Sequence, residues 1–200
     1  TMNVQASSAK KGETLHDTLD NIEAMASDLV VIRHNHAGVP HMLAKYHASQ
    51  IINAGDGRHD HPTQALLDAF TIRDRIRHQR NDPRATLDGV RVAIIGDIAH
   101  SRVARSNIFC LTKLGASVVV CGPRTLLPME VGRLGVDVTC DRAEAIDGAD
   151  VVYVLRMQLE RQAKALFPSI REYVRLFRVD NRALSHAPRH AFVMHPGPMN

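Results

Sequence analysis

The sequence predicts an α/β fold with two doubly wound parallel-sheet domains. Across its 200 residues, short β-branched segments alternate with segments whose apolar residues recur at helical spacing. Such alternation is typical of parallel sheets with helices on both faces. A polar, turn-rich stretch over residues 80–89 interrupts it, and polar or glycine-rich residues follow one predicted strand after another. These observations favour two domains whose ligands bind at strand ends.

The boundary between the two domains is predicted within this polar stretch. Asn81-Asp82-Pro83 and Asp88-Gly89 are turn-forming sequences, and the alternation restarts after them. We therefore assign residues 1–82 to a first domain and residues 83–200 to a second. A chain of this length accommodates two small domains.

The first domain is predicted to begin with a strand end at residues 3–5 and a helix from Thr14. Four apolar residues at helical spacing form the inner face of that helix: Leu15, Leu19, Ile22 and Met25. Residues 28–33 are rich in β-branched side chains and predict a short, buried strand. A helix over residues 39–48 and a strand over residues 50–53 follow.

The next stretch is a loop with two glycines that leads into a long helix. Gly55 and Gly57 allow backbone angles that other residues resist, and Pro62 suits a first helical position. The buried face of this helix comprises Ala65, Ala69, Ile72 and Ile76. His61 therefore lies at the helix N-terminus and Gln64 one turn inside, where backbone N–H groups and the helix dipole favour an anion. The alternative is a capped surface helix with incidental polar residues, and the local pattern leaves both open.

In the second domain, five apolar or β-branched segments are predicted as strands: residues 90–96, 116–121, 137–139, 151–155 and 191–194. Four segments between them are predicted as helices: residues 101–114, 128–133, 142–145 and 168–176. The first of these helices is expected to bury Ala104, Ile108 and Leu111.

The composition is that of a soluble globular protein, with 44% hydrophobic and 23% charged residues. Aromatic residues make up only 4%, Trp is absent and the basic residues are scattered, which argues against nucleic-acid binding. The formal charge of +4 suits small anionic substrates. No apolar run is long enough to span a membrane. Three cysteines without paired spacing predict free thiols and a cytoplasmic protein.

Polar or special-backbone residues follow five predicted strands. In chain order they are Arg33 and residues 55–61, 96–102, 156–158 and 195–198. In doubly wound sheets, ligands bind beyond the carboxyl ends of the strands. We therefore expect a substrate cleft between the two α/β domains.

Two arginines at these ends suit the carboxylates of a dicarboxylate substrate. Arg102 opens a helix and Arg156 ends a buried strand, and a guanidinium can bind a carboxylate through two parallel hydrogen bonds. Gln158 is placed to orient Arg156 or to contact the substrate. Asp97 and His100 are expected to shape their turn. A surface salt bridge is the alternative role of each arginine.

A phosphate site is predicted in the first domain. Arg33 ends its buried strand, and Lys10, Lys11 and the helix N-terminus at His61 would add positive charge. For the two lysines, a solvated loop is the alternative.

Two His-x-His pairs, His34 with His36 and His59 with His61, raise a metal-dependent hydrolase as an alternative. No acidic or cysteine ligand lies at a supporting spacing, so no metal is expected and the histidines are expected to form loop hydrogen bonds. The sequence also lacks a Gly-x-Ser-x-Gly elbow and a Gly-x-Gly-x-x-Gly fingerprint. Neither a serine nucleophile nor bound NAD is therefore expected.

Six motifs occur in a fixed order: Ser7-Ser-Ala-Lys-Lys-Gly-Glu-Thr-Leu, Val31-Ile-Arg-His, His61-Pro-Thr-Gln-Ala-Leu-Leu-Asp, Gly96-Asp-Ile-Ala-His-Ser-Arg, Arg156-Met-Gln and His195-Pro-Gly-Pro. Over nearly its whole length, the chain resembles the catalytic chains of bacterial aspartate carbamoyltransferases. Ornithine carbamoyltransferases also carry His-Pro-Thr-Gln. They usually have Ser-Met-Gly and His-Cys-Leu-Pro where this chain has its last two motifs.

The resemblance implies transfer of a carbamoyl group from carbamoyl phosphate to L-aspartate, an early step of pyrimidine biosynthesis, without metal or organic cofactor. Arg33 would contact the phosphate and carbonyl region, His61 the carbamoyl oxygen and Gln64 the carbamoyl amine. The backbone of Gly197 and Pro198 would accept from the same amine. His61 and Arg33 would be catalytic, because they could stabilise negative charge on the carbamoyl oxygen.

The resemblance also implies roles in aspartate binding and assembly. Arg102 and Arg156, with Gln158, would hold the carboxylates of aspartate. Ser7 would contact carbamoyl phosphate and Lys11 aspartate in the active site of a neighbouring subunit of a homotrimer. A regulatory or dihydroorotase-like partner chain is possible in this family. The first domain would bind carbamoyl phosphate and the second aspartate.

Two differences from the family lead us to expect a chain truncated at both ends. Family members carry a phosphate-binding Ser-Thr-Arg-Thr-Arg stretch before the matched region, and they continue past His195-Pro-Gly-Pro. We expect these 200 residues alone to be inactive or very weak. Two other functions stay open: a carbamoyltransferase for another amine acceptor, and a noncatalytic ligand-binding homologue or subunit.

Overall fold

The structure is a computed structural model that describes residues 13–157 and 169–199. The chain divides into two compact units, Thr1–His61 and Pro62–Asn200. Among the described residues, no helix is both long and apolar enough to span a membrane. The strand end predicted at residues 3–5 lies outside the described residues.

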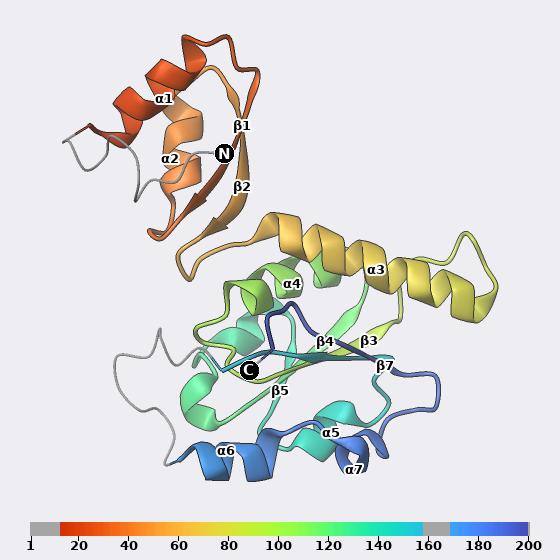
Figure 1. The fold of residues 1–200 in the computed structure, drawn as a ribbon. Coiled ribbons are helices and arrows are strands. Elements are labelled where there is room, and N and C mark those ends of the chain that lie inside the picture. The colour runs from red at the N-terminus through yellow and green to blue at the C-terminus, as the bar shows by residue number, and fades with distance from the viewer. Residues whose placement is uncertain (1–12, 158–168, 200) are drawn as a thin grey trace. The chain divides into compact units, whose positions relative to one another are not determined.

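The described part of the first unit, residues 13–61, contains two helices and two parallel strands (Figure 1): α1 (Leu15–Glu23), β1 (Leu29–His34), α2 (Val39–Tyr46) and β2 (Gln50–Asp56). Thr14 and Asp17 form a capping box at the start of α1. The Asp17 N–H donates to Thr14 Oγ1 (3.1 Å), and the Thr14 N–H donates to Asp17 Oδ2 (2.9 Å). The helix therefore begins where the sequence predicted.

The core of the first unit lies between the two helices and one face of the β1–β2 sheet. It comprises Leu19, Val39 and Leu43, with Leu15, Ile22, Val30, Ile32 and Ile51 packed against them. On the other face of the sheet, Leu29 and Val31 are 51% and 59% exposed. The prediction of a fully buried strand is therefore wrong, because α1 and α2 cover the same face (Figure 1). Met25 was also predicted to be buried, but it follows the end of α1 and is exposed.

The second unit is a five-stranded parallel sheet in the order β5-β4-β3-β6-β7. Its strands are β3 (Arg91–Ile95), β4 (Ser117–Cys121), β5 (Asp137–Thr139), β6 (Val151–Val154) and β7 (Phe192–Met194). Its helices are α3 (Pro62–Arg80), α4 (Arg102–Lys113), α5 (Arg142–Ile146), α6 (Ile170–Phe177) and α7 (Asn181–Leu184), with 3₁₀ turns η3 (Arg124–Leu126) and η4 (Val131–Leu134). This is the doubly wound arrangement that the alternation predicted.

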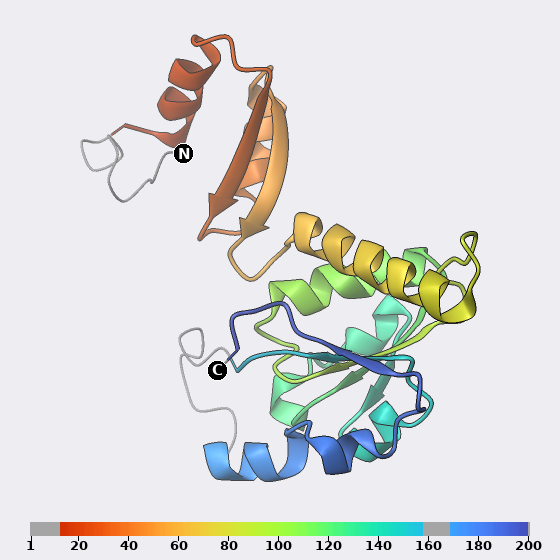
Figure 2. The same ribbon diagram turned by 45° about the vertical axis from the view of Figure 1, so that its right-hand side comes forward.

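Helices cover both faces of this sheet, α3 and α4 on one side and α5, α6 and α7 on the other (Figure 2). Alternate residues of β3 point to the two sides: Val92 and Ile94 pack with α3 and α4, and Ala93 and Ile95 pack with the other helices. All positions predicted to be inward on α3 and α4 are buried. Because both faces are covered, the central strands are continuous apolar runs.

Three features of the second unit differ from the prediction or extend it. The helix predicted at residues 128–133 is a 3₁₀ turn that begins at Val131, and neither Arg124–Leu126 nor Asn181–Leu184 was predicted. Segments of three or four residues are too short to show a helical period. Helix α3 groups with the second unit by its contacts. The boundary at residues 82 and 83 stays a prediction of the sequence.

Candidate active site

The sheet order of the second unit creates a switch point between β3 and β6. From β3 the chain continues through β4 to β5 on one side, and it returns through β6 to β7 on the other. At such a point the loops after the two central strands diverge and leave room for a ligand. Arg102 follows the loop after β3, and Arg156 lies in the loop after β6. Both predicted aspartate-binding arginines therefore lie at the carboxyl ends of the two central strands.

The turn after β3 is built from Gly96, Asp97 and His100. Gly96 has a φ of 137°, and a Cβ there would lie only 2.9 Å from Leu155 Cβ, so no other residue fits. Asp97 is buried, and its Oδ1 accepts from the His100 N–H (3.2 Å) and lies 2.8 Å from His100 Nδ1. These contacts confirm that Asp97 and His100 shape the turn.

Helix α4 begins directly after this turn, with Arg102 as its first residue. Ser101 caps the helix by accepting from the Ala104 N–H (3.1 Å). Only 6% of Arg102 is exposed. Such burial argues against a solvated surface role, because a buried guanidinium requires compensating polar or charged partners.

Arg156 and His195 line the same cavity, of about 460 Å³. They follow β6 and β7, which are neighbours in the sheet. Helix α6 provides an apolar wall through Ile170, Tyr173 and Phe177. The fold thus brings together two of the polar strand ends that the sequence singled out, and it places a positive charge beside an apolar surface.

His195 is held in one orientation by its own loop. The Gly197 N–H donates to His195 Nδ1 (2.8 Å), so the proton of the neutral ring lies on Nε2. Burial lowers the pKa of His195, and the positive charge of Arg156 lowers it further. The imidazole is therefore neutral at neutral pH and adds no charge next to Arg156. Gly197 and Pro198, which are joined by a cis peptide bond, are exposed.

Gln64 lies in the first turn of α3, and its side-chain amide is oriented by Asp68. Gln64 Nε2 donates to Asp68 Oδ1 (3.0 Å). The other oxygen of the same carboxylate accepts from Asn107 Nδ2 (2.8 Å) and from the Tyr153 hydroxyl (2.6 Å). Burial and the Asp68 charge both raise the pKa of Tyr153, so its hydroxyl remains a donor. Asp68 was not predicted as a site residue, because Asn107 and Tyr153 reach it from α4 and β6.

Replacing Asp68 by alanine should destabilise the second unit by about 2–4 kcal/mol, because it leaves the buried donors of Asn107 and Tyr153 unsatisfied. Denaturant unfolding of the full-length protein measures this change. Asp74→Ala on the same helix is the control, and we expect a change within about 0.5 kcal/mol because Asp74 is exposed. Equal effects of the two substitutions would contradict the role of the network.

In the first unit, Asp56 organises the loop that leads to His61. Its carboxylate is buried and accepts from the Gly38 N–H (2.6 Å), Asn53 Nδ2 (3.0 Å) and the Asp60 N–H (3.0 Å). Burial raises the pKa of Asp56, but these hydrogen bonds outweigh it and leave the pKa below its usual range. An aspartate between two glycines at the end of a strand was the sequence signal for this role.

Strand β2 extends to Asp56, so Gly55 lies in the strand and only Gly57 lies in the loop after it, but both have the positive φ that glycine allows. Gly55 and Gly57 have φ values of 117° and 52°, and a Cβ on Gly57 would lie 2.9 Å from the Asn35 carbonyl oxygen. His61 follows this loop directly and is half-buried. Arg33, at the end of β1, is exposed on the face of the sheet opposite α1 and α2.

The His-x-His pairs form local contacts, as expected. The His36 N–H donates to His34 Nδ1 (3.0 Å), and His59 Nδ1 lies 3.1 Å from Asp56 Oδ2. Neither pair belongs to a group of possible metal ligands in residues 13–157 and 169–199. Such a group is formed instead by Asp20, Glu23 and His47. Ser7, Lys11 and Gln158 lie outside the described residues.

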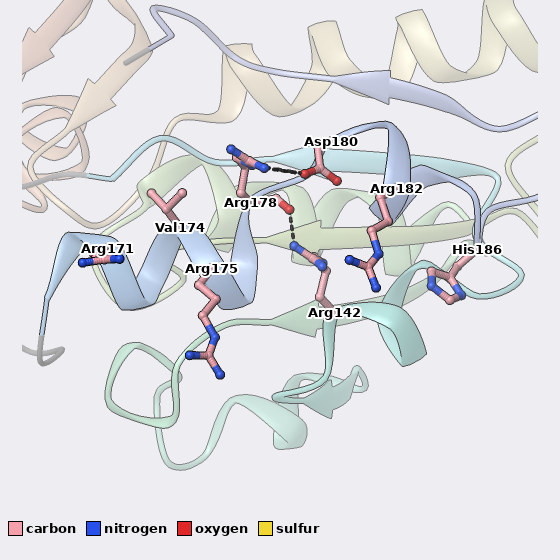
Figure 3. A pocket seen from close by; sticks show the side chains of 8 residues that line it. All are labelled: Arg142, Arg171, Val174, Arg175, Arg178, Asp180, Arg182 and His186. Atoms are coloured by element: carbon pink, nitrogen blue, oxygen red, sulfur yellow. Dashed lines mark hydrogen bonds and ion pairs between the residues drawn. The ribbon is translucent and has the colours of Figure 1, made fainter.

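A second cavity, of about 610 Å³, corrects the view that the basic residues are scattered. Five arginines from α5, α6, α7 and the segment before α7 line it (Figure 3): Arg142, Arg171, Arg175, Arg178 and Arg182. Arg178 donates to Asp180 Oδ2 through Nε and a terminal nitrogen (3.2 and 2.7 Å), and Arg142 donates to the Arg178 carbonyl. Arg171, Arg175, Arg178 and Arg182 follow one another at helical spacing in the sequence, and only Arg142 joins them from a distant segment by packing.

Comparison with known proteins identifies the family. The domain family described as "Aspartate/ornithine carbamoyltransferase, carbamoyl-P binding domain" matches residues 1–74. The family described as "Aspartate/ornithine carbamoyltransferase, Asp/Orn binding domain" matches residues 88–200. The chain belongs to the aspartate/ornithine carbamoyltransferase family. The resemblance drawn from the sequence motifs is thereby confirmed.

Named relatives and solved structures agree with this family. The chain is 54% identical over 199 residues to the aspartate carbamoyltransferase catalytic subunit of Ruminiclostridium cellulolyticum, covering 100% of this chain and 61% of that protein. It is 54% identical over 196 residues to that of Solibacter usitatus, covering 97% and 62%. The chain thus spans about three fifths of the length of the curated relatives it matches.

Aspartate transcarbamoylase from Trypanosoma cruzi has the same fold. Its complex with carbamoyl phosphate matches with a TM-score of 0.83 at 31% identity, over 100% of this chain and 64% of that one. Its complex with carbamoyl phosphate and aspartate matches with a TM-score of 0.80 at 30% identity, over the same shares. The likeness extends over both units of the present chain.

Proposed function

We propose that the protein containing this chain transfers the carbamoyl group from carbamoyl phosphate to the amino group of L-aspartate. The products are N-carbamoyl-L-aspartate and phosphate. The observation that carries this proposal is the position of Arg102 and Arg156 at the ends of β3 and β6, in a chain whose relatives are aspartate carbamoyltransferases. Two guanidinium groups there suit the two carboxylates of aspartate.

The chemistry requires little from the protein besides alignment and charge. The aspartate amine attacks the carbamoyl carbon, negative charge develops on the carbamoyl oxygen, and the leaving phosphate takes the amine proton. His61 and Arg33 stabilise the oxygen, and holding two reactants in line lowers the barrier further. No cofactor takes part in this scheme.

The contacts of Gln64 support its role towards the carbamoyl amine. Its amide nitrogen is engaged by Asp68, so its amide oxygen is the end directed away from that carboxylate. An amide oxygen accepts hydrogen bonds, as recognition of an NH₂ group requires. The carbonyl oxygens of Gly197 and Pro198 would accept from the same amine, and their loop is held by the His195–Gly197 hydrogen bond.

The test is an assay of the full-length protein with carbamoyl phosphate and either aspartate or ornithine as acceptor, followed by phosphate release. We expect turnover with aspartate and little with ornithine. Ornithine has only one carboxylate, whereas the two arginines are proposed to bind two. Preference for ornithine would contradict the proposal. Tight binding of a phosphonate analogue that joins both substrates, without any turnover, would instead identify a noncatalytic homologue.

We further propose a homotrimer that acts in pyrimidine biosynthesis in the cytoplasm. The motif that contains Ser7 and Lys11 supports active sites shared between subunits. The free thiols of Cys110, Cys121 and Cys140 suit a reducing compartment. We also include a regulatory or dihydroorotase-like partner chain in this proposal. The mass of the purified assembly tests whether the chain forms a homotrimer and whether a partner chain is bound to it.

A further inference from the structure

Helix α1 carries a stripe of potential metal ligands that the carbamoyl-transfer chemistry does not use. His16, Asp20 and Glu23 are spaced four and three residues apart, so they lie on one face of the helix. His47, at the end of α2, faces this stripe. Its Nδ1 lies 3.3 Å from Asp20 Oδ1 and 3.5 Å from Glu23 Oε2. Side chains from two separate elements thus converge on one point.

The environment of His47 favours a cation at that point. Its side chain is only 3% exposed, and Nδ1 has no hydrogen-bond partner of regular geometry among the described residues. Its other ring nitrogen, Nε2, lies 2.9 Å from His16 Nδ1. When Nε2 donates to His16, Nδ1 presents a lone pair to two carboxylates. That arrangement is unfavourable unless a positive charge lies between them.

We infer that Asp20, Glu23 and His47 form a binding site for a divalent transition-metal ion, for which Zn²⁺ is the best match. Around a tetrahedral zinc ion with nitrogen and oxygen ligands, neighbouring ligand atoms lie about 3.3–3.6 Å apart. The two nitrogen-to-oxygen distances of 3.3 and 3.5 Å agree with that spacing. One imidazole and two carboxylates leave the fourth position open.

Neighbouring groups orient two of the three ligands. The second oxygen of Glu23, Oε1, accepts from the Ser49 N–H (2.7 Å), which fixes the position of the carboxylate. His16 holds the ring of His47 from behind, as outer-shell partners of metal-bound histidines do. The site joins α1 to the segment between α2 and β2, so its role is to stabilise the first unit.

The experiment measures Zn²⁺ binding to the chelator-treated full-length protein by competition with a chromogenic indicator. We expect one equivalent per chain to bind at this site and the thermal unfolding midpoint to rise with Zn²⁺ concentration. His16→Phe should weaken binding about 10–100-fold, as loss of an outer-shell partner does. Asp20→Asn and His47→Gln remove direct ligands and should weaken it further.

Two features keep the test decisive. The Asp20 side chain is 66% exposed, so Asp20→Asn folds even if the buried His47 does not tolerate replacement. The control is Asp74→Asn with His78→Gln, an exposed pair 3.8 Å apart that no third ligand of the described residues joins, which should leave Zn²⁺ affinity unchanged. A chain that takes up no zinc would overturn the inference. Wild-type affinity in Asp20→Asn would do the same, since it would mean that the zinc ion binds elsewhere.

Discussion

Replacing His61 by alanine should lower kcat for aspartate carbamoylation about 10²–10³-fold, the usual cost of losing one donor to a developing oxyanion. The KM for aspartate should change little, because its carboxylates are assigned to Arg102 and Arg156. Steady-state kinetics of the full-length protein with saturating carbamoyl phosphate measures both quantities. His61 ends the loop that Asp56 organises and directly precedes α3, so its backbone position is defined from both sides.

The matched control is His78→Ala near the other end of α3. His78 is exposed and pairs with Asp74 at 3.8 Å, so its loss should leave kcat unchanged. Circular dichroism should show that both variants keep their fold. If His61→Ala retains the wild-type kcat, the carbamoyl oxygen is stabilised by other groups and the assignment of His61 is wrong.

Replacing Arg156 by leucine should raise the KM for aspartate about 100-fold or more, because two charge-assisted hydrogen bonds to a carboxylate are lost. Arg156→Lys should restore only part of the affinity, since an ammonium lacks the planar fork. The second readout is the pKa of His195, followed by NMR. Arg156 lowers this pKa, so Arg156→Leu should raise it, although burial still holds it below its usual range.

Arg171→Leu serves as the control for Arg156. Arg171 is exposed on α6, next to the same apolar wall but in the basic cavity, so neither the KM for aspartate nor the His195 pKa should change. An unchanged KM together with a raised His195 pKa in Arg156→Leu would show that Arg156 contacts His195 without binding substrate.

Much of the fold followed from local patterns. Pro62 and the four apolar positions of α3 predicted its start and its buried face, and every residue of that face is buried. The alternation of strands and helices predicted the parallel sheet of the second unit. These predictions succeed because helical and extended backbones impose their own periods on neighbouring residues. The six motifs were sufficient for the family.

Other features depend on residues far apart in the chain. Asp68 accepts a hydrogen bond from Tyr153, 85 positions away, and Arg156 and His195 line one cavity because β6 pairs with β7. His47 lies close to the ligand stripe on α1, and Arg142 joins the arginines of residues 171–182 in the basic cavity. The periodic pattern of apolar residues within one helix or strand does not predict such contacts between distant residues. The sequence by itself determined the order and approximate positions of most helices and strands, and it supplied the candidate side chains for the chemistry. Only the tertiary structure decided which buried polar groups meet, because that depends on how whole elements pack.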